Sequence, residues 1–356
     1  MQASSFALLD EQTSTANLET SALASDNGLV SLWRQWQALS DHLMPLLLSP
    51  HERQDFVGDI SECANTVLSL TRQAPDIGIF HMVFPNPDKM HRYSVLHAMH
   101  TALLLALIGQ RKDWGDKRTA SAVKAGLTMN LSITNLQIEL ALQSAPLSPA
   151  QREAIDQHPL TSRQMLQDLG VQDEEWLIAV AQHHEQADGK GYPQGLTELH
   201  QMADAIRTCD VFGAKISPRI GRTGMPTPRA ASEIFRQRSA GYFGATIIRE
   251  LGLYPPGCLV ELATGHHAVV VKRSCDPNAP DVVTLPAFER CRATQGSGRH
   301  IVGAASDQSW AERISAERLA WKVARAKETS WVDFAFYVGA TMENADSLGT
   351  LEQGEG

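Results

Sequence analysis

Residues 183–193 combine two adjacent histidines with a glycine-rich turn. His183 and His184 close an apolar run, residues 176–181, that has the spacing of a helix. Neighbouring imidazoles at the end of a helix can bind one cation together, and neutral histidine nitrogen is a favoured ligand of first-row metals. The stretch therefore predicts a metal site, and the alternative is a histidine-rich surface turn.

The turn after the histidines has a composition that fixes its backbone. Gly189 and Gly191 allow conformations closed to other residues, and Pro193 prevents the helix from resuming. The whole pattern, His-His-Glu-x-x-Asp-Gly-x-Gly-Tyr-Pro, resembles the signature of the HD-GYP domains, a branch of the HD superfamily of metal-dependent phosphohydrolases that hydrolyses cyclic di-GMP. The resemblance covers roughly residues 93–271, and its motif loop comprises Glu185, Asp188, Gly189, Gly191, Tyr192 and Pro193.

The resemblance implies a set of metal ligands gathered from several helices. Position by position, the ligands are His97, His158, His183, His184 and Asp210. Two cations close together polarise a phosphodiester and turn a bound water into a nucleophile near neutral pH. Without the resemblance, His97 reads as a buried histidine on an apolar helix, His158 as a helix-end residue and Asp210 as a surface carboxylate.

The His-Asp pair that gives the family its name is missing, so the chain resembles a degenerate member. Met129 stands in place of the histidine, Asn130 in place of the aspartate and Ile133 in place of a lysine. An amide or a thioether is a poor ligand for a hard divalent ion. We therefore expect one divalent ion (iron, manganese or zinc) or none, held by His158, His183 and His184, and no certain catalytic residue.

Two arginines match the positions that contact phosphate in the family. Arg219 and Arg222 follow the Asp210 segment, and a guanidinium fork suits phosphate oxygens. Gly221 stands where the family has a tyrosine, which argues against base stacking there. The alternative is a pair of exposed arginines without a ligand.

Composition limits the partners. The chain of 356 residues is 43% hydrophobic, enough for a sizeable core and more than one unit. A net charge of −9 argues against binding nucleic acid. Five scattered cysteines indicate neither a disulfide framework nor a thiolate zinc site. With no basic leader and no apolar run of membrane length, we expect a cytoplasmic protein without a membrane partner.

The elements predict a mainly α fold, an HD-type helical bundle with an N-terminal helical region and a small C-terminal β-hairpin extension. Helices are expected over 91–110, 117–142, 149–169, 174–184, 201–216 and 227–237, and a hairpin over 258–271 with a further strand at 282–285. The predicted organisation is a disordered lead-in (1–28), a helical region (29–88), the HD-GYP-like domain (89–254), a β-rich extension (255–300), and a helix with an acidic tail (301–356). The helical region at 29–88 is either a partner-binding unit or an extension of the main core.

Three functions remain open on these residues. The first is a catalytically impaired HD-GYP protein that acts in cyclic di-GMP signalling by binding cyclic di-GMP, a related nucleotide, or signalling proteins through its Gly-Tyr-Pro loop or N-terminal helices. The second is an active metal-dependent phosphodiesterase that hydrolyses cyclic di-GMP. The third is a ligand-free interaction scaffold. Assembly into a homodimer is also left open.

Overall fold

The computed structural model describes residues 31–84, 87–236, 243–276, 279–285, 290–293 and 301–304. The chain divides into two compact units, Trp36–Gln308 and a second that joins Met1–Gln35 to Ser309–Gly356. Of the second unit only residues 31–35 are described, and these are helical. The predicted lead-in over 1–28 and the predicted helix and tail beyond residue 304 lie outside the described residues.

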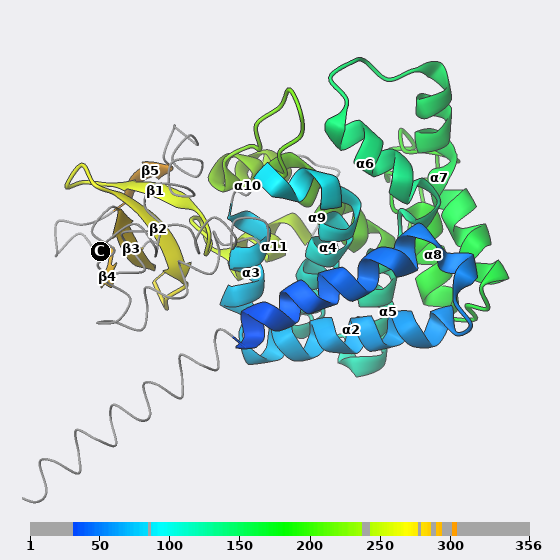
Figure 1. Ribbon diagram of the computed structural model, residues 1–356, viewed down its shortest axis with the longest axis horizontal. Coiled ribbons are helices and arrows are strands. Elements are labelled where there is room, and N and C mark those ends of the chain that lie inside the picture. The colour runs from blue at the N-terminus through cyan, green and yellow to red at the C-terminus, as the bar shows by residue number, and fades with distance from the viewer. Residues whose placement is uncertain are drawn as a thin grey trace, which may run out of the picture. The chain divides into compact units, whose positions relative to one another are not determined.

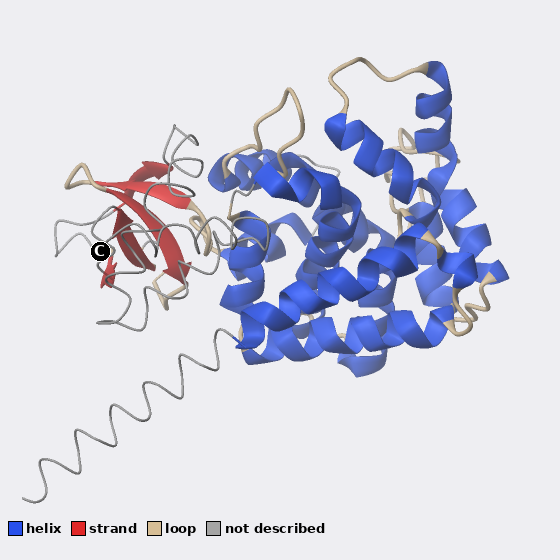
Figure 2. Cartoon of the chain, viewed as in Figure 1, coloured by secondary structure: helices blue, strands red, loops and turns tan. Residues whose placement is uncertain are grey.

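Helices make up most of the described chain (Figures 1 and 2). Residues 31–48 are helical. The elements that follow are η1 (Pro50–Glu52), α2 (Phe56–Gln73), α3 (Pro75–Val83), η2 (Pro87–Arg92), α4 (Tyr93–Arg111), α5 (Gly115–Thr128), η3 (Leu131–Ile133), α6 (Thr134–Leu142), α7 (Pro149–Asp168), α8 (Glu174–Gln182), α9 (Gln201–Ile216), α10 (Thr227–Arg236) and α11 (Phe243–Leu251). The mainly α fold predicted from the sequence is confirmed.

Helix α4 forms the core of the bundle. It contacts α2, α3, α5, α6, α9 and α11, and every residue from Tyr93 to Gly109 is buried. The helical stretch Met90–Arg111, which consists of the end of η2 and all of α4, is long and apolar enough to cross a membrane. However, 94% of its apolar 18-residue window is buried inside the protein. The expectation that no apolar stretch has membrane length is therefore wrong for this helix. Its composition is explained by its place in the core, since a helix that is apolar all round must be buried.

The predicted helix over 117–142 is in fact two helices separated by a break. Helix α5 ends at Thr128, and Ser132 donates its backbone N–H to the Ser162 hydroxyl of α7 (3.1 Å) instead of to a carbonyl of its own helix. The Ser132 hydroxyl in turn donates to the His158 carbonyl (3.2 Å). These side-chain bonds compete with helical bonds and explain the break. They also fix the break against α7, where His158 lies.

Helices α7 and α8 begin with strong caps. Ser148 and Gln151 form a capping box at α7, and the Asp173 carboxylate accepts the Trp176 N–H at α8. Inside the bundle, the Trp176 indole donates to the Thr128 hydroxyl at the end of α5 (2.8 Å). Helix α8, which ends just before His183, is thereby held to α5.

The strands form one antiparallel sheet in the order β4-β3-β2-β1-β5. Their bounds are β1 (Leu259–Leu262), β2 (His267–Lys272), β3 (Asp281–Leu285), β4 (Arg290–Arg292) and β5 (Ile301–Ala304). The predicted hairpin is β1 and β2, joined at Gly265, whose positive φ of 76° suits glycine. Strands β4 and β5 were not predicted, and β5 extends the β-rich region past the expected boundary at residue 300.

The N-terminal helices continue the main core. Helix α2 contacts α4 and α5, and α3, which begins at Pro75, contacts α4 and β2. Arg273, just after β2, pairs with Asp76 of α3. Helices α2 and α3 thus pack against the core helix α4.

Candidate metal centre and ligand site

His158 and His183 point their Nε2 atoms at each other. The two Nε2 atoms lie 3.0 Å apart, and the side chains are buried, with 2% and 0% exposure. On the opposite side of each ring, the Nδ1–H donates to a backbone carbonyl: that of Ile155 for His158 (2.5 Å) and that of Val180 for His183 (2.6 Å). Both Nε2 atoms therefore present lone pairs to the same point, which is the arrangement of two ligands around one cation.

The backbone carbonyls are available because of where each helix is interrupted. Pro159 has no N–H, so the Ile155 carbonyl, four residues earlier in α7, has no helical donor and accepts from His158. Helix α8 ends at Gln182, so the Val180 carbonyl is likewise left for His183. The proline after one histidine and the helix end before the other thus set both tautomers.

The spacing of the two rings fits a metal ion. Two imidazole nitrogens bound to one tetrahedral ion at about 2.0–2.1 Å would lie about 3.3 Å apart, close to what is observed. Burial lowers the pKa of His158 to about 3 and also lowers the pKa of His183 and His184, which favours neutral, metal-binding imidazoles. Ligand atoms of His158, His183 and His184 all lie within 4.8 Å of one another. The predicted three-histidine set is therefore assembled and fits one ion.

The motif loop closes over His184. The Tyr192 ring stacks on the His184 imidazole at 4.6 Å between centroids, and the Tyr192 N–H donates to the His184 carbonyl. Beneath the loop, Glu185 is fully buried and accepts the N–H groups of Gln194 (2.7 Å) and Leu196 (2.9 Å). Since each Glu185 oxygen already holds a backbone donor, this carboxylate shapes the loop and does not replace a lost metal ligand.

Gly191 is the position in this loop with the least room. A Cβ there would lie 2.3 Å from the Gln186 nitrogen and 2.4 Å from the Glu185 Cα, both backbone atoms. We expect Gly191→Ala to lower stability by about 3 kcal/mol, or roughly 6–12 °C in Tm. Thermal melting should be compared with Lys190→Ala, whose side chain is 80% exposed. Equal melting temperatures for the two variants would contradict this role of the loop backbone.

His97 and Asp210 are joined to each other. The His97 Nε2–H donates to the Asp210 carboxylate (2.7 Å), and His97 is 2% exposed. Burial alone would raise the pKa of Asp210, but the hydrogen bond from His97 and the nearby imidazoles outweigh it and hold that pKa below its usual range. The atoms that would bind a second ion are thus occupied by one another, so this pair as it stands does not fit a metal.

The residues that stand in place of the His-Asp pair lie in a turn beside α7. Met129 follows the last residue of α5 and is 1% exposed, and Ile133 in η3 is 8% exposed. The Asn130 carbonyl between them accepts the Ile133 N–H (3.0 Å). Met129 and Ile133 are therefore part of the packed interior, Asn130 is half-buried, and none of the three adds a carboxylate or an imidazole to the site.

The two predicted phosphate-binding arginines have different environments. Arg222 donates through Nη2 to the carbonyls of Ala214 (2.6 Å) and Ser217 (3.3 Å), so it closes the C-terminal end of α9. Arg219 donates through Nη2 to the Tyr93 hydroxyl (2.5 Å), and its Cζ lies 4.7 Å from the centre of that ring. Burial and the neighbouring Arg219 lower the pKa of Arg222. The two guanidinium groups therefore concentrate positive charge near one another.

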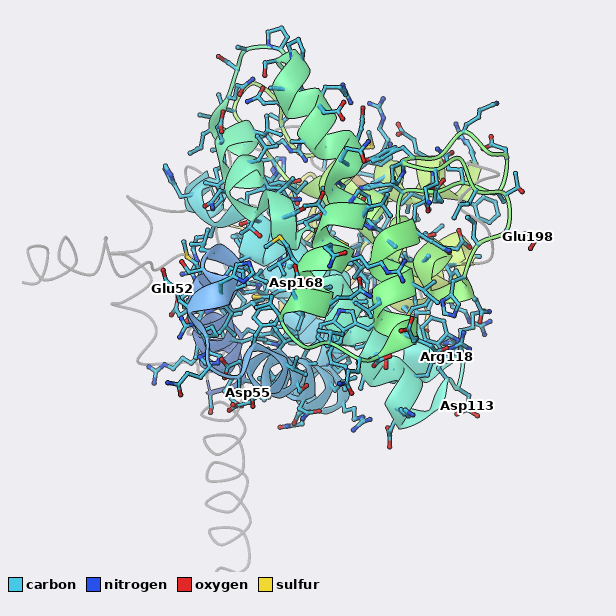
Figure 3. The ribbon with its side chains drawn as sticks, turned by 90° about the vertical axis from the view of Figure 1, so that its right-hand side faces the viewer. Glu52, Asp55, Asp113, Arg118, Asp168 and Glu198 are labelled. Atoms are coloured by element: carbon cyan, nitrogen blue, oxygen red, sulfur yellow. The ribbon has the colours of Figure 1, made fainter. Side chains whose placement is uncertain are left out.

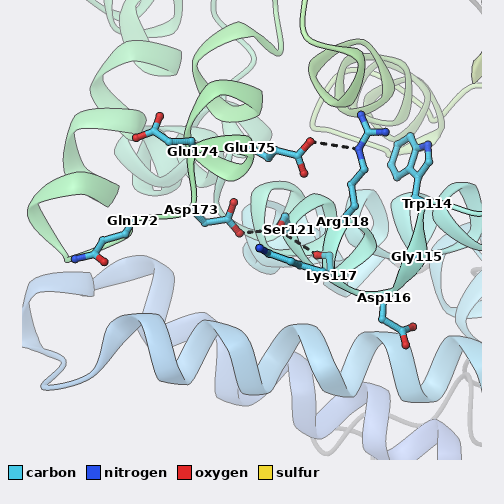
Figure 4. Close-up of a pocket in the computed structure, with 10 residues that line it drawn as sticks. All are labelled: Trp114, Gly115, Asp116, Lys117, Arg118, Ser121, Gln172, Asp173, Glu174 and Glu175. Atoms are coloured by element: carbon cyan, nitrogen blue, oxygen red, sulfur yellow. Dashed lines mark hydrogen bonds and ion pairs between the residues drawn. The ribbon is translucent and has the colours of Figure 1, made fainter.

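A groove that does not include His158, His183 or His184 lies between the start of α5 and the start of α8 (Figure 4). It has a volume of about 710 Å³ and carries charges of both signs. Arg118 pairs with Glu175 (3.4 Å), and Ser121 donates to Asp173 (2.6 Å). Arg118 of this groove lies on the face shown in Figure 3, near Asp113. None of the three predicted histidine ligands lines this groove, so its size is not an argument for placing the chemistry there.

Sequence reasoning missed two contributors to the site. Tyr93 lies one helical turn before His97, and the two rings stack at 5.6 Å with an interplanar angle of 9°. The spacing of four residues on one helix was the signal that could have identified it. The pairing of Ser132 with Ser162 (2.9 Å), which anchors the substituted turn to α7, has no signal in the sequence.

The chain was compared with known protein families and solved structures. The sequence profile described as the HD domain matches residues 82–247. A structure of an HD-GYP-type protein from Bdellovibrio bacteriovorus is similar with a TM-score of 0.48 and 17% identity, covering 59% of this chain and 68% of that one. Residues 82–247, which match the HD domain, include every predicted metal ligand.

Three curated proteins have similar sequences. A cyclic di-GMP phosphodiesterase of Pseudomonas aeruginosa is 25% identical over 189 residues, covering 51% of this chain and 45% of that protein. A 3′3′-cGAMP-specific phosphodiesterase of Vibrio cholerae is 27% identical, covering 40% and 31%. The cyclic di-GMP phosphodiesterase PdeB of Borreliella burgdorferi is 23% identical, covering 56% and 54%. The chain thus spans about half or less of the length of each relative.

Proposed function

We propose that this chain, whose residues 82–247 match the HD domain family, is a member of its HD-GYP branch and binds cyclic di-GMP, or a related cyclic dinucleotide, without hydrolysing it. The protein would act in cyclic di-GMP signalling as a receptor of the nucleotide. The observation that carries the proposal is that Met129, which is buried, and Asn130 stand where the resemblance expects the His-Asp pair.

Loss of the His-Asp pair would affect catalysis more than it affects nucleotide binding. A two-metal site stabilises both the attacking and the leaving oxygen of a phosphodiester, and here the second set of ligands is reduced to His97 and Asp210. The His97 Nε2 atom and the Asp210 carboxylate are hydrogen-bonded to each other. The remaining set, His158, His183 and His184, fits one ion, which when bound would supply a Lewis acid for a phosphate oxygen.

The charges around the site favour an anionic ligand. Arg219 and Arg222 bring two guanidinium groups together, and the backbone of one pairs with that of the other (2.9 and 3.0 Å). A dianionic nucleotide would neutralise this charge, and a guanidinium matches phosphate oxygens with two parallel hydrogen bonds. The names of the similar proteins, which specify cyclic di-GMP or 3′3′-cGAMP, support a cyclic dinucleotide as the ligand.

The second candidate is an active phosphodiesterase. It is favoured by the preserved alignment of the His158 and His183 Nε2 atoms, because that arrangement serves a metal and has no other partner among the described residues. In that case His97 would have to leave Asp210 so that both could reach a second ion. The two candidates differ in one measurable property, the opening of the cyclic dinucleotide.

We expect Arg219→Ala to weaken binding of cyclic di-GMP by roughly 10- to 100-fold, the effect of losing one or two charge-assisted hydrogen bonds. Isothermal titration calorimetry of the full chain gives the dissociation constant, and chromatography of the same sample shows whether the nucleotide is opened. Arg229→Ala is the matched control, because Arg229 is 71% exposed and pairs with Glu233 of its own helix.

The outcomes separate the candidates. Binding without product, lost in Arg219→Ala and kept in Arg229→Ala, supports the receptor. Product formation by the wild-type protein supports the phosphodiesterase. A wild-type melting temperature that rises with neither metal nor nucleotide would contradict both and leave an interaction scaffold, since a ligand of the folded state must stabilise it.

A further inference from the structure

The guanidinium of Arg219 is held on one side and unsatisfied on another. Its Nη2 donates to the Tyr93 hydroxyl at 2.5 Å, while its Nε is buried and has no hydrogen-bond partner among the described residues. A buried donor without an acceptor is costly, on the order of 1–3 kcal/mol. The unsatisfied Nε therefore marks a place where an acceptor from a ligand would be favoured.

Tyr93 fixes the direction of that guanidinium. Its hydroxyl accepts a hydrogen bond from Nη2, and its ring face lies 4.7 Å, measured to the ring centre, from Cζ. The Tyr93 side chain cannot move freely, since it lies on the core helix α4 and is 5% exposed. An arginine at the end of a loop has many rotamers, and two contacts with one rigid ring remove most of them.

The same ring also contacts His97 of its own helix. Tyr93 stacks on His97, whose Nε2–H binds the Asp210 carboxylate at 2.7 Å. The order Arg219, Tyr93, His97, Asp210 is thus a continuous set of contacts between loop 217–222, α4 and α9. The loop is itself tied to α6, where the Ile220 N–H donates to the Ala141 carbonyl (2.8 Å).

We propose that Tyr93 is a positioning residue for the ligand, which orients Arg219 so that its Nε edge receives a phosphate oxygen of the nucleotide. The inference rests on the proposed binding of a cyclic dinucleotide and adds a residue to it. Tyr93 itself does not touch the phosphate. Its hydroxyl acts on binding only through Arg219, whereas its ring supports His97 regardless of the ligand.

The test is a double-mutant cycle on the full chain with cyclic di-GMP as the probe. Tyr93→Phe removes the hydroxyl and keeps the ring, so we expect binding to weaken roughly tenfold, about the effect of one hydrogen bond to a charged group. Arg219→Ala should weaken binding further, and Tyr93→Phe should have no additional effect in the Arg219→Ala background. Coupling of this kind is what a shared role requires.

Controls distinguish positioning from general damage. Metal content and Tm of Tyr93→Phe should equal those of the wild type, because the ring that contacts His97 is kept. Arg219→Lys keeps the charge without the planar fork, and its affinity should be insensitive to Tyr93→Phe. Wild-type affinity in Tyr93→Phe, or independent effects of the two substitutions, would overturn the role of Tyr93 while leaving nucleotide binding intact. No binding by the wild-type chain would overturn both.

Discussion

Restoring the His-Asp pair should create a second metal site. We expect Met129→His with Asn130→Asp to raise the metal content from about one ion per chain to about two, with hydrolysis of cyclic di-GMP appearing where the wild type shows none. The reason is that an imidazole and a carboxylate would join His97 and Asp210, which at present are hydrogen-bonded to each other. Elemental analysis and separation of the nucleotide products measure both effects.

The restored site must displace an existing hydrogen bond. A metal that binds the His97 Nε2 atom and the Asp210 oxygen needs the His97 proton to move from Nε2 to Nδ1, because a neutral imidazole carries one proton and binds a metal through its other nitrogen. Ile133→Lys can be added as a third change, since the family has a lysine at that position and Ile133 is 8% exposed.

The control is the same double variant carrying His158→Ala. If the new activity depends on a complete metal centre, that background should abolish it, because His158 supplies one of the two facing Nε2 atoms. Turnover that persists without His158 would show that the activity arises elsewhere. Failure of the folded double variant to gain a second ion would mean that the turn at residues 129–133 cannot present ligands.

The second large effect concerns the three histidines themselves. We expect His183→Ala to lower metal affinity by at least about 100-fold, beyond the 10- to 100-fold typical of losing a supporting contact to a ligand. The substituted protein should be isolated with close to no metal. The bound metal can be followed by elemental analysis after dialysis and by the loss of the metal-dependent rise in Tm.

Burial makes one further variant necessary here. His183 is fully buried, so His183→Ala also leaves a cavity. His184→Ala removes a less buried ring of the same set and should lose metal with a smaller loss of stability. His51→Ala is the matched control, since His51 is exposed in η1 and outside the cluster. Retention of metal by both site variants would contradict the three-histidine centre.

The sequence predicted the parts of the site that depend on residue type and local spacing. The adjacent histidines, the glycine-rich loop and the helices before and after them follow from short-range patterns, and the structure brings His158, His183 and His184 together as expected. The sequence also contained Pro159, but its consequence, a free carbonyl that orients His158, required knowing that α7 continues past it.

What the sequence could not supply depends on contacts between distant segments. Arg222 matched a phosphate-binding position, yet its Nη2 caps α9, because the loop folds back on the helix end. Tyr93 lies 126 residues from Arg219 in sequence, so nothing local indicated their contact. The predicted helix over 117–142 failed because a bond from Ser132 to Ser162 competes with the helix. Such tertiary bonds override local propensity.

The central claim is that this chain keeps one metal position and has lost the two-metal chemistry. The most direct test is metal content of the wild-type protein purified without chelator, measured on the same sample as cyclic di-GMP turnover. We predict one ion per chain or fewer, and no opened product with added iron, manganese or zinc. About two ions per chain together with product would contradict the account and show that other residues replace the missing pair.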